Sequence, residues 1–353
     1  MKTVALYSPY IPKHAGGGEK YLLSIAEEAS KSHKTMLLVS DSQSDQTKKR
    51  LREYEKIFGL NLSSVNVVGA NVASLESRKY DVLFAMTDGS FFWSLAKKSY
   101  LIIQIPWTRK LSSVEKIKLR SWKNIIVYDK FVQNILRNSW QTSKIEVVEP
   151  YVDTSEFIPL AKQNIILNVG RFFSHSQSNS KRQDILIEAF KDLLKEKIGD
   201  WTLVLAGAVD PNPDSEQYLK SLREAAAGYP IEIRTDVTFE ELKKLNGHAT
   251  VYWHAAGYGV SESAHPENTE HFGITTLEAM AAGAVPFVVP KGGQREIVNA
   301  EEQFWNTKEE LVAKTKKFIS LSPIPIEQIQ KRMRSNCELY SKDMFAKKIE
   351  TLL

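Results

Sequence analysis

The chain has 353 residues, of which 42% are hydrophobic and 25% are charged, and its formal net charge at pH 7 is +5. This is the composition of a soluble globular protein, and the length predicts two domains rather than a single core. The sequence contains no apolar run of the ~20 residues that cross a bilayer, and its N-terminus lacks the pattern of a signal peptide. Cys337 is the only cysteine, which excludes an internal disulfide and is typical of a reducing, cytoplasmic compartment.

The charge is unevenly distributed along the chain. Residues 1–150 contain 23 Lys and Arg against 14 Asp and Glu, a net charge of +9, whereas the remainder contains 24 against 28, a net charge of −4. A basic first half and a mildly acidic second half indicate two domains that meet different partners. An ordinary solvated surface is an equally good interpretation.

The first half of the chain alternates continuous apolar runs with helical or polar stretches. Runs of this kind predict a parallel sheet that helices cover on both faces. A glycine-rich loop, AGGGE at 15–19, follows the first run and precedes a helix with apolar residues at helical spacing. The predicted strands are residues 3–8, 35–40, 81–86, 100–105 and 124–129.

The same alternation restarts after a proline-flanked extended segment at 149–159, which we interpret as a linker. It predicts a second Rossmann-like half, with a closing helix at the end of the chain. The expected strands are residues 164–171, 201–207, 230–237, 249–255 and 284–290, and the clearest helix is 181–197. The expected domains are therefore 1–150 and 151–335, with a C-terminal helix at 336–353 that packs back toward the first domain.

Ligands of such sheets bind outside the carboxyl ends of the strands, where the glycine-rich loop falls. Backbone amides at the start of the following helix suit an anion. The loop is not a dinucleotide fingerprint, because the last glycine of a G-x-G-x-x-G pattern from Gly16 would fall on Tyr21. A purely structural turn is the alternative.

Cations gather at the carboxyl end of the strand at 164–171. Arg171 stands at its tip, and Lys181 and Arg182 open the next helix after a polar loop. Arg can hold two oxygens at once and Lys supplies a point charge, so this arrangement suits a diphosphate. Solvated loop cations are the alternative.

Two glutamates stand eight residues apart in EHFGITTLE, residues 270–278. In a continuous helix their Cα atoms would be about 12 Å apart along the axis and about 80° around it, too far for the ~5 Å pair of a retaining glycosidase. The glycine at 273 indicates instead that the helix begins near Thr275, preceded by the unpaired amides of residues 272–274. We therefore expect Glu270 and these amides to hold hydroxyls of one ligand, and Glu278, one turn inside the helix, to hold another hydroxyl pair.

The segment EHFGITTLEAMAAGAVPFVVPKGGQREIV resembles the E-x7-E signature of the retaining nucleotide-sugar glycosyltransferases of family four. Further stretches match family positions in order and extend the resemblance over nearly the whole chain: GGGEKYLLSIAEEA, YVDTSEFIP, NVGRFFSHSQSNSKRQDILIEAF, FEELKKL and FAKKIETLL. The resemblance implies the GT-B fold, an α/β architecture of two Rossmann-like domains facing a central cleft. The first domain would lie on the acceptor side and the second would bind the nucleotide-sugar donor.

The resemblance also implies roles for individual residues. Arg171 and Lys181 match the pair that binds the donor diphosphate and neutralises the leaving group, and Glu270 matches the glutamate beside the donor sugar. The other donor-binding candidates are Gly16 and Gly17 over the phosphates, Phe272, Gly273 and Ile274 on sugar hydroxyls, Thr275 at the phosphate, Glu278 on the ribose, Val237 near the base, and Gln104.

Histidines and Gln104 complete the candidates. Gln104 stands where many relatives carry a histidine. It cannot act as a general base, so we expect a donor-sugar contact, and an ordinary strand-end glutamine is an equal alternative. His14, beside the glycine loop, is either an acceptor-side contact or a solvated residue. For His254 and His271, pocket shaping or packing is expected.

The predicted function is retaining transfer of a hexosyl group from a GDP- or UDP-sugar, such as GDP-mannose or UDP-glucose, to a saccharide or lipid-linked acceptor. The resemblance implies a front-face mechanism in which the leaving phosphate takes the acceptor's proton.

No D-x-D, H-E-x-x-H or Cys/His cluster occurs, so we expect no metal and no cofactor, with cationic side chains opposing the charge of the departing diphosphate. A catalytically silent GT-B carbohydrate- or nucleotide-binding protein is the main alternative; an epimerase or phosphorylase fits the motifs less well.

The stretch TRKLSSVEKIKLRSWK, residues 108–123, carries six Lys and Arg against Glu115 alone, interleaved with apolar residues. This pattern suits an anionic membrane or a lipid-phosphate acceptor, so peripheral contact at the cytoplasmic face of a membrane is one expectation. A solvated basic helix face is the other. The sequence shows no basic face with stacking aromatics, so a nucleic-acid partner is not expected.

Overall fold

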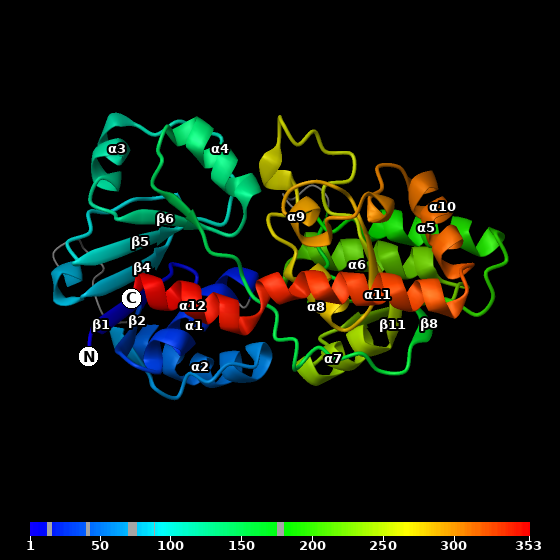
Figure 1. Cartoon of the computed structure of the whole chain (residues 1–353), viewed down its shortest axis with the longest axis horizontal. Coiled ribbons are helices and arrows are strands. Elements are labelled where there is room, and N and C mark those ends of the chain that lie inside the picture. The colour runs from blue at the N-terminus through cyan, green and yellow to red at the C-terminus, as the bar shows by residue number, and fades with distance from the viewer. Residues whose placement is uncertain (13–15, 40–42, 70–75, 88, 175–179) are drawn as a thin grey trace. The chain divides into compact units, whose positions relative to one another are not determined.

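The computed structural model describes the chain except for residues 13–15, 40–42, 70–75, 88 and 175–179. The described chain divides into two compact units (Figure 1). Unit 1 comprises Met1–Pro150 and Lys342–Leu353, and unit 2 comprises Tyr151–Ser341. None of the helices in the described part of the chain is long and apolar enough to cross a membrane.

Unit 1 is built on a parallel sheet of seven strands in the order β3-β2-β1-β4-β5-β6-β7 among the described residues. Leu6 of β1 lies opposite Leu37 of β2 on one side and Phe84 of β4 on the other, so this central strand meets apolar residues on both neighbouring strands. The strands are β1 Thr3–Tyr7, β2 Lys34–Val39, β3 Val65–Gly69, β4 Val82–Met86, β5 Lys98–Ile102, β6 Asn124–Val127 and β7 Ile145–Val147.

Helices cover both faces of this sheet: Figure 1 shows α1, α2 and α12 below it and α3 and α4 above it. They are α1 Gly17–Ser30, α2 Ser44–Phe58, α3 Ser113–Leu119, α4 Lys130–Trp140 and α12 Lys342–Leu352, with a 3-10 turn η2 at Glu76–Lys79. Helix α12 belongs to unit 1 although it ends the chain. Lys342 pairs with Glu27 of α1 at 3.0 Å, and the Tyr100 hydroxyl donates to the Leu352 carbonyl at 3.0 Å.

The closing helix differs from the expected 336–353. Helix α11 continues to Cys337, a 3-10 turn follows, and α12 begins only at Lys342. The interruption is caused by a contact with the linker. The Val152 amide donates to the Tyr340 carbonyl at 2.9 Å, and Ser341 forms a parallel bridge with Val152. The extended backbone needed for that bridge cannot also be helical.

The described residues of unit 2 contain a parallel sheet of five strands in the order β10-β9-β8-β11-β12. The chain moves outward from β8 to β10 and then returns to place β11 on the other side of β8. The carboxyl ends of β8 and β11 therefore form the topological switch point, where α/β proteins bind ligands. The strands are β8 Gln163–Val169, β9 Thr202–Gly207, β10 Ile231–Thr235, β11 Ala249–His254 and β12 Val285–Val288.

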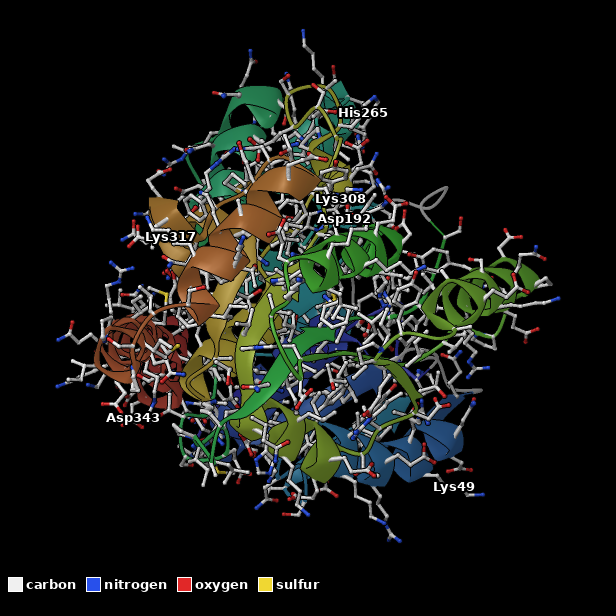
Figure 2. All side chains as sticks on the ribbon, turned by 90° about the vertical axis from the view of Figure 1, so that its right-hand side faces the viewer. Lys49, Asp192, His265, Lys308, Lys317 and Asp343 are labelled. Carbon is white, nitrogen blue, oxygen red and sulfur yellow. The ribbon has the colours of Figure 1, made fainter. Side chains whose placement is uncertain are left out.

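The helices of unit 2 also form two layers. One core cluster joins the sheet to α5, α6 and α10, and another joins it to α7 and α8. Lys308 of α10 pairs with Asp192 of α5 at 2.8 Å, and Figure 2 shows these two side chains next to each other. The helices are α5 Gln183–Lys195, α6 Pro213–Ala226, α7 Phe239–His248, α8 Ile274–Ala281, α9 Gln294–Val298, α10 Lys308–Ile319 and α11 Pro323–Cys337, with 3-10 turns η3 Pro266–Asn268, η4 Glu301–Gln303 and η5 Glu338–Tyr340.

Candidate active site

Three polar side chains meet at the switch point of unit 2. Lys181 Nζ lies 2.5 Å from Glu270 Oε2, and His254 Nε2 lies 2.9 Å from the same oxygen. Lys181 precedes α5 in the connection after β8, His254 ends β11, and Glu270 lies in the connection after β11. The structure thus brings together two of the predicted catalytic residues, Lys181 and Glu270, and adds His254 to them.

The alternation of β11 places His254 on the side of α8. Residues of a strand point to opposite faces in turn, so Trp253 lies in the core under α5 and α10 while Tyr252 lies in the core under α8. His254 shares the face of Tyr252, and the two rings stack with centroids 6.5 Å apart. The Tyr252 hydroxyl lies 2.8 Å from Thr275 Oγ1 at the start of α8, which ties this strand to the helix.

Glycines create the space for these side chains. A Cβ on Gly170 would lie 2.8 Å from Lys181 Cγ, so the glycine lets the lysine chain pass across the end of β8. A Cβ on Gly292 would lie 1.9 Å from the Glu270 carbonyl oxygen, and the neighbouring Gly293 amide donates to that oxygen at 2.9 Å. The KGG turn after β12 therefore holds the backbone of Glu270 at a distance that no larger residue allows.

The electrostatics of the cluster keep Glu270 charged. Burial raises the pKa of Glu270, but the charge of Lys181 and the hydrogen bonds from His254 and Lys181 outweigh it and hold that pKa below its ordinary value. Burial lowers the pKa of His254, whose side chain is 1% exposed, although Glu270 partly opposes the shift. His254 is therefore neutral at pH 7. Because a carboxylate can only accept, the imidazole carries its proton on Nε2 and donates it to Glu270.

Helix α8 begins at Ile274, one residue before the expected start. Gly273 precedes it in the left-handed region with φ 104°, which favours glycine, and a Cβ there would lie 2.4 Å from Gln294 Nε2. Among the described residues, no protein group accepts a hydrogen bond from the amides of Phe272, Gly273 or Ile274. These amides form a donor set at the positive end of the helix.

The two glutamates of the motif lie in different settings. Glu270 is in the connection before α8 with Lys181 and His254, whereas Glu278 lies one turn inside α8 and its residue is 4% exposed. The expected separation of Glu270 and Glu278 into loop and helix positions agrees with this structure.

Arg171 and Lys181 lie beside the same strand end but have different partners. The Arg171 side chain is 53% exposed, its Nη1 lies 3.4 Å from Asp210 Oδ1, and it covers the Phe173 ring. Lys181 turns to Glu270 instead. Arg182 pairs with Asp184 at 2.9 Å and covers the Tyr258 ring, so its charge is used within the fold.

The first-domain candidates gather within unit 1. Gly16 caps α1 and its amide donates to Glu19 Oε2 at 2.8 Å, while a Cβ on the exposed Gly17 would meet nothing within 4 Å. A Cβ on Gly18 would lie 2.4 Å from Gln104 Nε2. Gln104 thus lies against the first turn of α1, at the carboxyl ends of β4 and β5, and its Nε2 lies 2.6 Å from Met86 Sδ. His14 lies outside the described residues.

Val237 follows the edge strand β10 and precedes the Thr238 cap of α7. It is half-buried and packs against the core under α7. In the part of the chain that the structure describes, no three His, Cys, Asp or Glu side chains are grouped closely enough to hold a metal ion.

Comparison with known proteins places this chain in a family. Residues 154–351, more than half of the chain, match the family model described as "Glycosyl transferases group 1". The chain belongs to this family. Within it, the chain is 26% identical over 214 residues to the alpha-1,3/1,6-mannosyltransferase alg-2 of Neurospora crassa, covering 52% of this chain and 44% of that protein.

A second relative of this glycosyl transferase family is the GDP-Man:Man(3)GlcNAc(2)-PP-Dol alpha-1,2-mannosyltransferase of Xenopus laevis. It is 28% identical over 180 residues, which cover 46% of this chain and 34% of that protein. The chain therefore spans less than half the length of these two curated relatives.

Two solved structures resemble the whole chain. A glycosyltransferase from Rickettsia africae has a TM-score of 0.75 at 18% identity and covers 99% of this chain and 97% of its own. A sucrose-phosphate synthase from Thermosynechococcus elongatus has a TM-score of 0.72 at 16% identity, with 100% and 98% covered. At such identities the likeness shows the fold, and it confirms the predicted α/β architecture of two Rossmann-like domains, the GT-B fold.

Proposed function

We propose that the protein transfers a hexosyl group from a nucleotide-diphosphate sugar to a saccharide or lipid-linked acceptor, with retention of configuration and without a metal ion. The observation that carries this proposal is the cluster of Lys181, Glu270 and His254 at the switch point of unit 2. The amides before α8, which donate to no protein group among the described residues, support it. Family membership supports the nucleotide-sugar donor. GDP-mannose is the preferred donor because the relatives' names specify mannosyl transfer, and UDP-glucose is the second candidate.

In this proposal the charges of the cluster are rearranged when the donor binds. The diphosphate takes Lys181 from Glu270 and recruits the exposed Arg171, and the amides before α8 add positive potential. Glu270 stays anionic because His254 still donates to it, and its charge then lies beside the sugar, where positive charge develops. The departing phosphate takes the acceptor's proton.

The remaining assignments belong to the same proposal. The E-x7-E motif holds the donor, with Glu278 on the ribose, and unit 1 presents the acceptor. The other donor contacts are Gly16, Gly17, Gln104, Val237, Phe272, Gly273, Ile274 and Thr275. A lipid-linked acceptor is supported by the PP-Dol group in the name of the Xenopus laevis relative.

The basic stretch 108–123 supports peripheral contact with an anionic membrane at its cytoplasmic face. Leu111 and Trp122 are buried, so these two apolar positions serve the core. Val114 and Ile117 of α3, however, are 59% and 45% exposed among the basic residues. Exposed apolar side chains beside cations are the combination that interfacial helices use.

The test is to incubate the full chain with GDP-mannose, UDP-glucose and other nucleotide sugars, with and without lipid-linked saccharide acceptors. The expected result is release of the nucleoside diphosphate and transfer of the sugar, both slowed on the order of 10²-fold in Glu270→Gln. Donor binding without release across the whole panel would reject catalysis and favour the silent carbohydrate- or nucleotide-binding protein, the reading that Gln104 in place of a histidine supports.

A further inference from the structure

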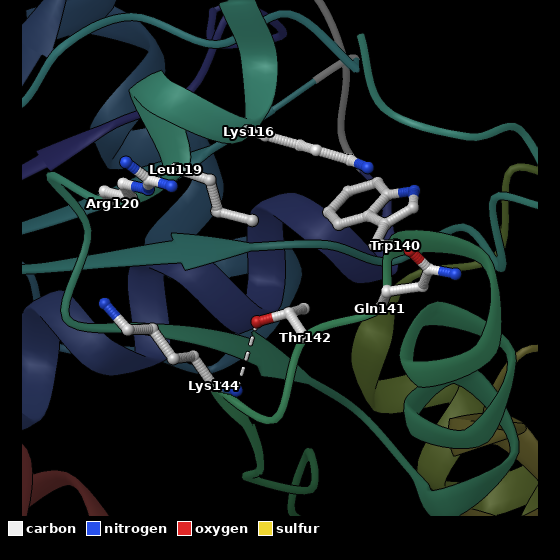
Figure 3. A pocket seen from close by; sticks show the side chains of 7 residues that line it. All are labelled: Lys116, Leu119, Arg120, Trp140, Gln141, Thr142 and Lys144. Carbon is white, nitrogen blue, oxygen red and sulfur yellow. Dashed lines mark hydrogen bonds between the residues drawn. The ribbon is translucent and has the colours of Figure 1, made fainter. Parts of the chain in front are cut away.

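A cavity of about 200 Å³ lies in unit 1 between the ends of α3 and α4 and the turn that precedes β7. Its lining residues are Lys116, Leu119, Arg120, Trp140, Gln141, Thr142 and Lys144, and Figure 3 shows Leu119 and Trp140 between the lysine chains. We infer that this cavity binds the phosphate group of an anionic amphiphile, with the adjoining carbons of the ligand against Leu119 and Trp140.

The charge of the cavity is positive and largely unpaired. Lys116, Arg120 and Lys144 line it together, and its lining contains no carboxylate. In the described part of the chain Lys116 and Arg120 form no ion pair, and Lys144 Nζ reaches only the Trp122 carbonyl at 3.4 Å. Glu115, next to Lys116 in the chain, accepts two hydrogen bonds from Arg109 at 2.8 and 3.1 Å. Glu146, two residues after Lys144, accepts one from Asn124 Nδ2 at 2.8 Å.

Helix dipoles do not account for all of this charge. Cations are favoured at helix carboxyl ends, which explains Arg120 at the end of α3. Lys144 lies in the turn after α4 rather than on a helix, yet it lines the same cavity. Three cations around one cavity repel one another, and an anion with several oxygens would remove that repulsion by accepting from each of them.

The apolar and hydroxyl side chains of the lining indicate which chemical group the bound anion carries. The side chains of Leu119 and Trp140 are buried, and Phe91 holds the indole of Trp140 in an edge-to-face contact at 5.4 Å. Thr142 Oγ1 accepts from the Lys144 amide at 3.3 Å, which leaves its own proton to donate to an anion. The cavity volume is roughly seven times the ~30 Å³ share of a water molecule, enough for a phosphate and a few methylene groups.

The position of the cavity separates it from the donor candidates. It adjoins the residues that lead into β6 and β7, at the amino ends of these strands, whereas Gln104 and the glycine loop lie at carboxyl ends in the same sheet. The inference therefore rests on the proposed membrane contact of residues 108–123, which it deepens, and does not depend on the sugar transfer. Ile117, which follows the lining residue Lys116 in α3 and is exposed, offers apolar contact to the continuing tail.

The experiment measures binding of dihexanoyl phosphatidic acid, below its micelle concentration, to the full chain by calorimetry. Saturable binding is expected, with inorganic phosphate bound at least about tenfold more weakly because it lacks the carbons that contact Leu119 and Trp140. The triple variant Lys116→Ser, Arg120→Ser, Lys144→Ser should lose about tenfold or more in affinity. The single variant Lys49→Ser, an exposed lysine of α2, is the matched control and should bind normally.

Vesicles then identify the source of the phosphate. Flotation with phosphatidic-acid vesicles but not with phosphatidylcholine vesicles assigns the cavity to a membrane lipid, and binding of the short-chain ligand without flotation assigns it to a soluble phosphate ester; either supports the site. Absence of saturable binding, equal affinity for inorganic phosphate, or an equal loss in Lys49→Ser would overturn it. Thermal unfolding of each variant excludes misfolding, and sugar release measured on the same samples reports separately on the transferase proposal.

Discussion

Replacing Glu270 by glutamine tests the central cluster, because it keeps the shape of the side chain and removes its charge. Glu270 accepts one hydrogen bond from Lys181 and one from His254. A charge-assisted hydrogen bond is roughly twice as strong as a neutral one, so the loss is about 1 kcal/mol at each contact and about 2 kcal/mol together. For a unit of the size of Tyr151–Ser341 this lowers the melting temperature by roughly 4–8 °C.

The same substitution should affect turnover more than donor affinity. If the Glu270 charge stabilises positive charge that develops on the sugar, kcat should fall by on the order of 10²-fold with a smaller change in KM. The assays are differential scanning calorimetry, donor titration calorimetry and initial rates. Glu267→Gln is the matched control, since Glu267 is three residues away in the chain and its carboxylate pairs, among the described residues, with the exposed His265 alone.

Two outcomes would refute this reasoning. Normal turnover with weakened donor binding would show that Glu270 acts in binding rather than in the transition state. An unchanged melting temperature would show that the contacts with Lys181 and His254 contribute nothing to stability.

The other predictions concern the same unit. Arg171→Ala and Lys181→Ala should each lower transfer by on the order of 10²-fold, measured as initial rates, and unchanged rates in both would remove these residues from the site. Glu278→Gln should raise the donor KM more than it lowers kcat, and the reverse pattern would contradict a ribose contact. Activity should survive saturating EDTA; complete loss restored by Mg²⁺ or Mn²⁺ would contradict the metal-free proposal. Because burial lowers the pKa of His254, the unfolded chain takes up a proton below pH about 6.5 that the folded chain does not. The free energy of unfolding should therefore decrease as the pH is lowered through that range. The decrease should be less steep in His254→Phe.

Most strands of the two sheets could be predicted from the sequence because they are continuous apolar runs. The runs at 35–40 and 249–255 correspond to β2 and β11 within a residue or two. The edge strands β3 and β7 were not predicted, since β3 is partly exposed along its length and β7 has only three residues. A short strand at an edge carries too few buried residues to produce an apolar pattern.

The candidate site was predictable in part. The roles of Glu270 and Lys181 came from a family resemblance, but their direct contact depends on β8 and β11 being neighbours, which is a property of the whole sheet. The sequence leaves His254 open between pocket shaping and packing, because a lone histidine has no local pattern. Its position at the carboxyl end of a strand next to the motif was the available signal. The approach of Gly292 to the Glu270 carbonyl joins two distant segments, and no local rule reveals it.

The return of α12 to unit 1 has a consequence for synthesis. Unit 2 is one continuous segment, Tyr151–Ser341, whereas unit 1 needs both Met1–Pro150 and the last twelve residues. On the ribosome the second unit can complete its core while the first still exposes the surface of α1 that α12 covers. A chain shortened before Lys342 would leave Glu27 without its lysine and would damage the unit that was made first.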